Sequence, residues 1–186
     1  MDPTLETPRL ILRRFTDADL EPFLAYRSDP EIARYQGWSE PYTREMAQEF
    51  IQEMKTRQLG EPGALFQWAI EERLSGEMIG DLAFYLLSRD TRQAEIGATL
   101  ARSYHGLGYA REAVQRLLEY LFDELDLHRV SANCDPENTP AWLVLERLGF
   151  RREAHFVENL LFKGRYADEY WYAMLRREWL VVKQTR

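Results

Sequence analysis

A run of small residues in the middle of the chain is the clearest candidate for chemistry. The segment His105-Gly106-Leu107-Gly108-Tyr109-Ala110 lies between a predicted strand and a predicted helix. The first turn of a helix leaves about four backbone N–H groups unpaired, and the helix dipole adds partial positive charge there. Small residues at positions 106, 108 and 110 would let a phosphate approach these groups, and Arg102 and Arg111 flank them. The segment therefore predicts either a pyrophosphate-binding loop or a tight turn whose glycines supply positive φ angles.

Other chemical motifs are missing or incomplete. Arg111 fills the third glycine position of a dinucleotide-binding fingerprint, and no series of βαβ units accompanies it. The sequence contains neither the phosphate loop of nucleoside triphosphatases nor the G-x-S-x-G elbow of hydrolases. His105, His128, His155 and Cys134 lack the spacing of zinc ligands, so we expect no metal site.

The predicted elements interleave strands and helices. Apolar alternation and short apolar runs predict strands at 9–15, 66–72, 78–87, 92–102, 128–134, 151–162 and 166–175. Helical spacing predicts helices after Thr16 and Thr43 and over 109–125, 140–149 and 176–182. Only the connection from 92–102 through a helix to 128–134 is typical of a parallel crossover. We therefore expect residues 1–186 to form one α+β domain and not a doubly wound sheet.

The composition narrows the classes of function. A hydrophobic content of 45% with 30% charged residues excludes a disordered chain, and no apolar run approaches the roughly 20 residues of a membrane span. The 24 Lys and Arg against 31 Asp and Glu give a net charge of −7, which argues against nucleic-acid binding and mildly favours a cationic partner. Cys134 is the single cysteine, and residues 1–6 hold no signal core, so we expect a cytoplasmic protein.

Two segments carry a resemblance to a known family. His105 to Ala113 resembles motif A of the GCN5-related N-acetyltransferases (GNAT), written [QR]-x-x-G-x-[GA], and Asn138 to Phe150 resembles motif B, N-x-x-[SA]…L-x-x-x-G-F. Thr7 to Arg13 and Glu95-Ile96-Gly97 are similar to the Rim-type branch, whose members include ribosomal-protein N-terminal acetyltransferases. The match runs in the family's order from about Leu5 to Leu175.

The resemblance implies a fold and a way of binding acetyl-CoA. The family's sheet is mixed but mostly antiparallel, with about seven strands, helices on both faces and a V-shaped splay between strands 4 and 5. Those strands correspond here to 92–102 and 128–134. The residues implied for cofactor binding are Thr99, Leu100, His105, Gly106, Leu107, Gly108, Tyr109, Ala110, Arg111 and Asn138. Asn138 is also suited to capping the helix that it precedes.

The implied reaction is attack by an amine on the acetyl-CoA thioester. An alkyl amine has a pKa near 10.4 and is protonated at neutral pH, so a base is needed. Glu95 is the first candidate, because related enzymes often place a carboxylate on the strand beside the cofactor; Glu158 is the second and Asp81 the third. Glu95 could instead be a solvated acid at the end of its strand. Leu145 and Ala141 occupy positions where relatives often carry a tyrosine or a serine, so the general acid is unassigned.

The acceptor is expected to lie between the loop 35–38 and the hairpin 155–169. Possible aromatic walls are Trp38, Phe156, Tyr166 and Tyr170, and possible cation-attracting acids are Glu40, Glu158, Asp168 and Glu169. Core aromatics and solvated acids are the competing interpretation. A small cationic amine and a protein or peptide N-terminus both stay open as acceptors, a homodimer is possible, and an acyl-CoA sensor without turnover is the alternative function.

Overall fold

The structure, a computed structural model, describes residues 3–185, so Met1 and Asp2 of the stretch read for a signal core lie outside it. The strands are β1 Leu5–Glu6, β2 Leu10–Arg13, β3 Phe66–Glu72, β4 Met78–Leu87, β5 Asp90–Leu100, β6 Arg129–Cys134, β7 Arg151–Phe162 and β8 Arg165–Leu175. The helices are α1 Leu20–Arg27, α2 Pro30–Ala33, α3 Arg44–Thr56, α4 Tyr109–Glu119, α5 Thr139–Leu148 and α6 Arg176–Gln184. In this part of the chain no helix is both long and apolar enough to cross a membrane.

The strands form one mixed sheet in the order β1-β2-β3-β4-β5-β6-β8-β7. Every neighbouring pair is antiparallel except β5 and β6, which confirms the predicted α+β class and its single parallel crossover. The sheet has eight strands where about seven were expected, because β1, a two-residue strand that lies before the predicted strand 9–15, pairs with β2 and places Leu5 opposite Leu12. Pro8 lies in the turn between them and has no N–H to donate to a ladder.

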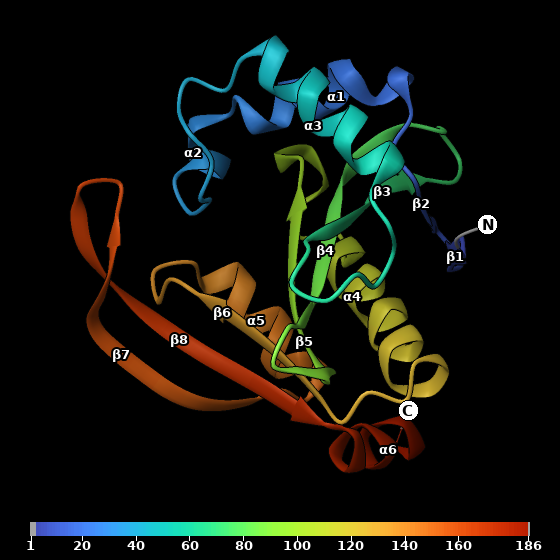
Figure 1. Cartoon of the computed structure of the whole chain (residues 1–186), viewed down its shortest axis with the longest axis vertical. Helices are drawn as coiled ribbons and strands as arrows, with labels where there is room; N and C mark the ends of the chain where they lie inside the picture. Colours follow the sequence, from blue (N-terminus) through green and yellow to red (C-terminus); the bar gives the residue numbers. More distant parts are fainter. Residues whose placement is uncertain (1–2, 186) are drawn as a thin grey trace.

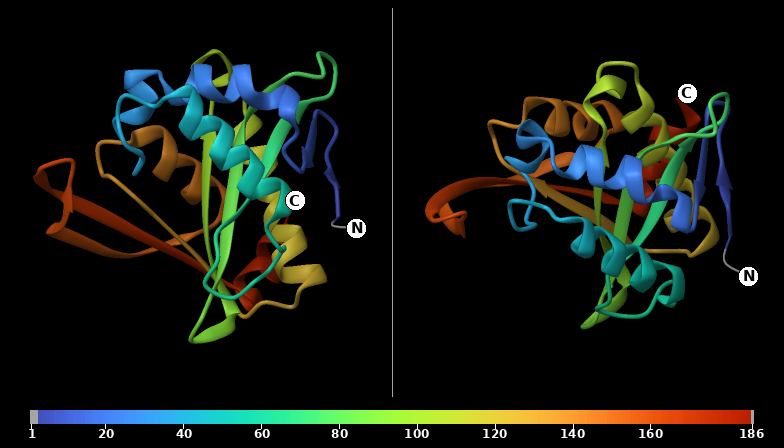
Figure 2. Two further views of the ribbon diagram at one scale, coloured as in Figure 1. Left: turned by 45° about the horizontal axis from the view of Figure 1, so that its top comes forward. Right: turned by 90° about the horizontal axis from the view of Figure 1, so that it is seen from above.

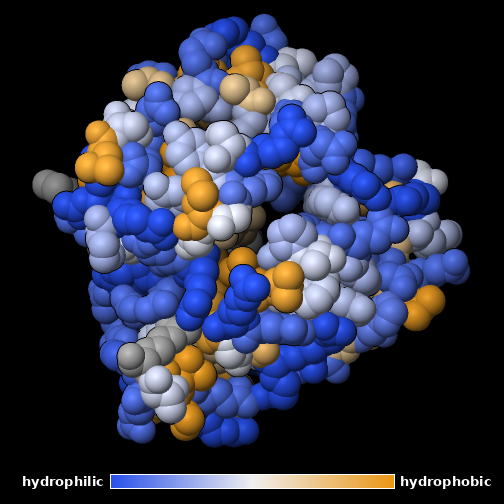
Figure 3. Space-filling model, turned by 180° about the vertical axis from the view of Figure 1, so that it is seen from behind, coloured by the Kyte–Doolittle hydropathy of each residue, from blue (hydrophilic) through white to orange (hydrophobic). Residues whose placement is uncertain are grey.

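Helices cover both faces of the sheet and enclose two apolar clusters (Figures 1 and 2). On one face α4 and α5 pack through residues such as Leu117, Leu118 and Leu148 onto Trp68 and Phe84 of the sheet. On the other face α1 and α3 enclose a second cluster, built from Phe15, Phe23, Tyr26, Ile51, Met54 and their neighbours. Alternate residues of a strand point to opposite faces, so each central strand contributes side chains to both layers. The rear face is mostly hydrophilic and is hollowed near its middle (Figure 3).

The parallel pair β5–β6 is short and then opens. Hydrogen-bonded register joins Gln93 to Arg129, Ala94 to Val130 and Glu95 to Ser131, and it stops there. Strand β5 continues to Leu100 along β4, while β6 continues to Cys134 along β8. The two strands therefore diverge after Glu95, which is the predicted V-shaped splay.

Two local features differ from the predicted elements. The Asp29-Pro30 pair ends α1 as expected, but it also begins the short helix α2, whose first turn is capped by the Asp29 carboxylate accepting from the Glu31 N–H at 3.0 Å. The long helix predicted over 109–125 is α-helical only to Glu119 and continues as a π-helical turn, Tyr120–Glu124. Both are local backbone variations that apolar spacing does not specify.

Candidate active site

The segment of small residues forms a loop of backbone donors at the start of α4. Gly106 and Gly108 have φ angles of +76° and +82°, and Gly108 is the N-cap of the helix. Within residues 3–185, the backbone N–H groups from Gly106 to Arg111 donate to no acceptor. Intramolecular hydrogen bonding begins at Glu112, whose N–H donates to the Gly108 carbonyl at 3.1 Å. A cluster of free N–H groups at a helix N-terminus suits a phosphate or pyrophosphate.

Arg9 holds this loop from the other end of the chain. Its Nε donates to the Glu112 carboxylate at 2.6 Å, its Nη1 donates to the Leu107 carbonyl at 3.0 Å, and its guanidinium lies 4.3 Å from the centre of the Tyr109 ring. The Thr7 hydroxyl donates to the same carboxylate at 2.6 Å. Thr7 and Arg9 belong to the segment similar to the Rim-type branch, but nothing in the local sequence shows that the β1–β2 turn lies beside α4.

The predicted cofactor residues lie at or after the ends of β5 and β6, where the two strands have diverged. Thr99 and Leu100 lie on the part of β5 that pairs with β4 but, among the described residues, has no partner strand on its other edge. The His105 ring is tied back to this strand, with Nε2 2.9 Å from the Leu100 carbonyl. Asn138 is the N-cap residue of α5, but its side chain makes no capping hydrogen bond, so the capping interpretation of its amide is wrong.

Glu95 stands at the vertex of the splay. It is the last residue of β5 that pairs with β6, and its side chain is half-buried. The Tyr85 hydroxyl donates to Glu95 Oε2 at 3.0 Å. Burial raises the pKa of Glu95 above its ordinary value, the Tyr85 hydrogen bond opposes that rise, and the negative charge of Glu169 adds to it. A carboxylate with a raised pKa is a stronger base at neutral pH.

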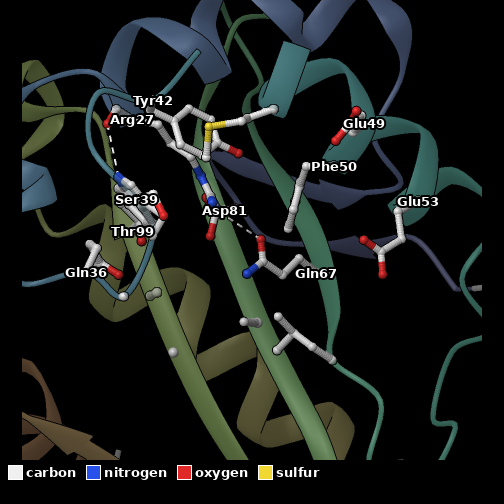
Figure 4. Close-up of a pocket in the computed structure, with 17 residues that line it drawn as sticks. Arg27, Gln36, Ser39, Tyr42, Glu49, Phe50, Glu53, Gln67, Asp81 and Thr99 are labelled. Atoms are coloured by element: carbon white, nitrogen blue, oxygen red, sulfur yellow. Dashed lines mark hydrogen bonds and ion pairs between the residues drawn. The ribbon is translucent and has the colours of Figure 1, made fainter. Parts of the chain in front are cut away.

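A cavity of about 630 Å³ lies beside this vertex, between α3 and the sheet (Figure 4). Its floor is formed by β4 and β5, including Asp81, Ala83, Gly97 and Thr99. Its walls are the loop before α3 and α3 itself, from which Phe50 points toward the floor. A Cβ built on Gly97 would meet nothing within 4 Å, so the floor is open above the splayed part of β5.

Most of the chain matches a known family. Residues 9–151 match the family model described as the acetyltransferase (GNAT) domain. The chain belongs to the GNAT acetyltransferase family. The uncharacterized N-acetyltransferase p20 of Bacillus licheniformis is 36% identical over 95% of this chain and 98% of its own. The prediction of an acetyl-CoA-dependent N-acetyltransferase is thereby confirmed.

Solved structures agree with this assignment. An acetyltransferase of the GNAT family from Bacillus anthracis is similar with a TM-score of 0.84 and 30% identity, covering 94% of this chain and 99% of its own. The spermidine N-acetyltransferase of Vibrio cholerae, solved with CoA and spermine, is similar with a TM-score of 0.78 and 25% identity, over 94% and 99% of the two chains. The free N–H groups of the loop and the open edge of β5 fit a CoA molecule in the acetyltransferase.

The other two candidate bases of the acetyltransferase lie in different surroundings. The side chain of Glu158 is exposed at an irregularity in β7, where its φ is +48° and its N–H donates to Asp168 at 2.9 Å. Asp81 is buried, accepts from the Tyr26 hydroxyl and pairs with Arg27 at 3.3 Å. A carboxylate already neutralised in this way is poorly suited to take a substrate proton.

Leu145 and Ala141, at the two positions where the family resemblance led us to look for a general acid, cannot donate a proton from their side chains. Leu145 is buried in the apolar cluster and Ala141 is half-buried. Tyr104 donates to Glu77 at 3.1 Å and packs edge-on against Tyr109, in keeping with packing roles for both rings. Burial raises the pKa of the Cys134 thiol to about 12, so it stays protonated at neutral pH and is no nucleophile.

An internal cation occupies the aromatic part of the cavity. The Arg27 guanidinium lies 4.3 Å from the ring centres of Trp38 and Phe23 and 4.7 Å from that of Phe50. The Trp38 indole N–H donates to the Arg27 carbonyl at 3.1 Å, which fixes the loop on α1. Trp38 therefore lines the cavity as expected, but its ring serves the protein's own guanidinium.

Most of the other predicted acceptor residues have partners within the chain. Glu40 pairs with Lys163, Asp168 with His155, and Glu169 accepts from Asn159. Tyr170 lies under the Arg152 guanidinium at 3.9 Å, and Tyr166 is 66% exposed. Glu49 and Glu53, which were not among the predicted site residues, line the cavity from α3. Glu49 and Glu53 are four residues apart in α3 and lie on either side of the inward-facing Phe50 in the sequence. This spacing, which places both on one side of the helix, is the only local signal for them.

Replacing Arg9 by alanine is expected to raise the KM for acetyl-CoA about three- to tenfold with little change in kcat, because the loop loses two hydrogen bonds that hold it. Steady-state kinetics with varied acetyl-CoA measure this. Arg44→Ala is the matched control, since Arg44 is 47% exposed against 43% for Arg9 and also pairs with a carboxylate, that of Glu21. Equal KM changes in both variants would contradict a specific role for Arg9.

Proposed function

We propose that this acetyltransferase moves the acetyl group of acetyl-CoA to a primary amine by direct attack, with Glu95 as the base. The observation that carries the proposal is the half-buried carboxylate at the vertex of the splay, next to the floor of the cavity. Acetyl-CoA supplies the acyl group in the activated form of a thioester. The loop from Gly106 to Arg111 binds the pyrophosphate, and the open edge of β5 binds the pantetheine arm.

The protein contributes to the chemistry by accepting the amine proton and by stabilising the developing negative charge. The amine proton passes to Glu95, directly or through a water, as the N–C bond forms and the C–S bond breaks. A backbone N–H at the splay is the donor for the developing oxyanion. The CoA thiolate has an ordinary pKa of roughly 8.5 and can leave without a tyrosine or serine, so Leu145 and Ala141 are compatible with turnover.

The charges around the cavity favour a small cationic amine as the acceptor. Asp81 is paired with Arg27 and Glu53 is paired with Arg57, whereas the Glu49 carboxylate, within the described residues, has no ion pair or hydrogen bond. One carboxylate at the cavity is thus free to attract a second positive charge on the acceptor. The complex of the Vibrio cholerae relative with spermine supports this choice over a peptide N-terminus.

A panel of amines tests the proposed function. CoA thiol release is measured with acetyl-CoA and each of spermidine, an aminoglycoside and N-terminal peptides. Release that depends on a cationic small amine is the expected result. Release with peptides alone would overturn the acceptor, and CoA binding without release in the presence of any amine would favour the sensor.

The Glu49→Gln variant is expected to raise the KM for a polycationic acceptor about two- to fivefold, since an exposed ion pair contributes about 0.2–1 kcal/mol. The KM for acetyl-CoA should not change. Glu61→Gln removes one negative charge from an exposed position outside the cavity and controls for net charge. An equal increase in both variants would show that only the overall charge matters.

A further inference from the structure

Two side chains face each other across the β4–β5 ladder at the candidate active site. Tyr85 and Glu95 are direct cross-strand partners, and the Tyr85 hydroxyl donates to Glu95 Oε2 at 3.0 Å. Both side chains are half-buried. Directly opposed residues in an antiparallel pair lie on the same face of the sheet, so the contact follows from the register of the two strands.

This pair continues the floor of the cavity. On the same face, Asp81 is paired with Thr99 and Ala83 with Gly97, and all four residues line the cavity. Tyr85 and Glu95 are the next pair in the row, because the side-chain period of a strand is two. Glu95 thus lies where the acceptor cavity meets the vertex of the splay.

The hydrogen bond makes the two carboxylate oxygens of Glu95 different. Oε2 accepts from Tyr85, whereas Oε1, within residues 3–185, has no hydrogen-bond partner. A carboxylate with one oxygen fixed by a donor presents the other in one orientation. We propose that Tyr85 is a positioning residue that holds Glu95 so that Oε1 takes the proton of the acceptor amine. This inference rests on the proposed role of Glu95 as the base.

Other groups near Tyr85 and Glu95 affect their pKa values through charge and do not donate a hydrogen bond to Glu95. Glu169 of β8 and Arg89, beside the β4–β5 turn, act on Glu95 and Tyr85 respectively as charges. Ser131, the β6 partner of Glu95, donates instead to the Ala94 carbonyl at 3.3 Å. A donor hydroxyl stabilises the ionised carboxylate, so its removal makes Glu95 hold its proton to higher pH.

The test is the pH dependence of kcat/KM for the acceptor amine in three variants. In the Tyr85→Phe variant the acidic limb is expected to move up by about half to one pH unit, with a lower kcat and an unchanged KM for acetyl-CoA. Phenylalanine keeps the ring, so packing is retained. Tyr172→Phe removes a hydroxyl that donates to Glu146 at 3.0 Å outside the cavity and should leave the limb in place.

The Glu95→Gln variant separates the failure of this inference from that of the proposed function. If Glu95→Gln keeps the limb of the unmodified enzyme, Glu95 is not the base and the proposed mechanism fails. If Glu95→Gln removes the limb but Tyr85→Phe does not move it, the base stands and the role of Tyr85 fails. A loss of rate in Tyr85→Phe that is equal at every pH also overturns the role, because it marks a purely structural contact.

Discussion

Replacing Glu95 by glutamine is expected to lower kcat by about 10²- to 10⁴-fold, the usual contribution of a general base, with little change in the KM for acetyl-CoA. Glutamine keeps the size of the side chain and can still accept the Tyr85 hydrogen bond, so only the proton acceptor is lost. The measurement is thiol release at saturating acetyl-CoA and amine. Burial raises the pKa of Glu95, so activity should fall with acid at a pH above the ordinary carboxyl value of 4.5.

The Glu158→Gln variant shows whether the base has been assigned to the correct acid. Its side chain is exposed on β7, away from the β5–β6 vertex in the strand register. A large loss of kcat in Glu158→Gln together with a small loss in Glu95→Gln would contradict our assignment and place the base on the hairpin. The melting temperature of each variant should match that of the unmodified protein, which separates a chemical loss from unfolding.

Replacing Gly108 by alanine is expected to raise the KM for acetyl-CoA roughly tenfold. An L-residue at a φ of +82° costs about 1–2 kcal/mol, and the loop can relieve that strain only by turning its N–H groups away from the ligand. A Cβ at this position would lie 3.5 Å from Arg9 Nη2, an ordinary contact, so the expected effect comes from the backbone. Isothermal titration with CoA measures the same loss without turnover.

Gly164 provides a control for the strain itself. It also has a φ of +82°, and a Cβ there would meet nothing within 4 Å. Gly164 lies in the turn between β7 and β8, outside the loop and the cavity. Gly164→Ala should therefore lower stability by a similar amount and leave CoA binding unchanged. Unaltered CoA affinity in Gly108→Ala would mean that the loop does not hold the pyrophosphate.

The loop at the start of α4 could be predicted because its signals are local. A strand, two glycines and the start of a helix are consecutive in the sequence, so their chemistry does not depend on distant contacts. The order of strands and helices also gave the mixed sheet and its one parallel crossover. The position of Leu145 in motif B likewise predicted that the tyrosine often found there in relatives is absent.

The cavity and the residues that line it could not be predicted in this way. The cavity arises because α3 lies across β4 and β5, and the residues 35–38 alone do not show that Trp38 stacks on Arg27. The acids chosen from the hairpin were reasonable by charge, but tertiary contacts give most of them partners within the chain. Glu49 is distinguished from the other cavity carboxylates only by the ion pairs of Asp81 with Arg27 and of Glu53 with Arg57, which the sequence does not show.

The register of β4 and β5 shows most clearly what the amino-acid sequence leaves open. Near the turn Leu87 is paired with Asp90, and simple extension of that register would place Tyr85 opposite Arg92. An irregularity between Leu86 and Leu87 instead brings Tyr85 opposite Glu95. By itself the sequence determined the fold class, the glycine-containing loop at the start of α4 and the strand that carries Glu95, because periodicity and capping act over a few residues. Only the tertiary structure decided which side chains meet, since register, helix placement and ion pairing are set by packing between segments far apart in the chain.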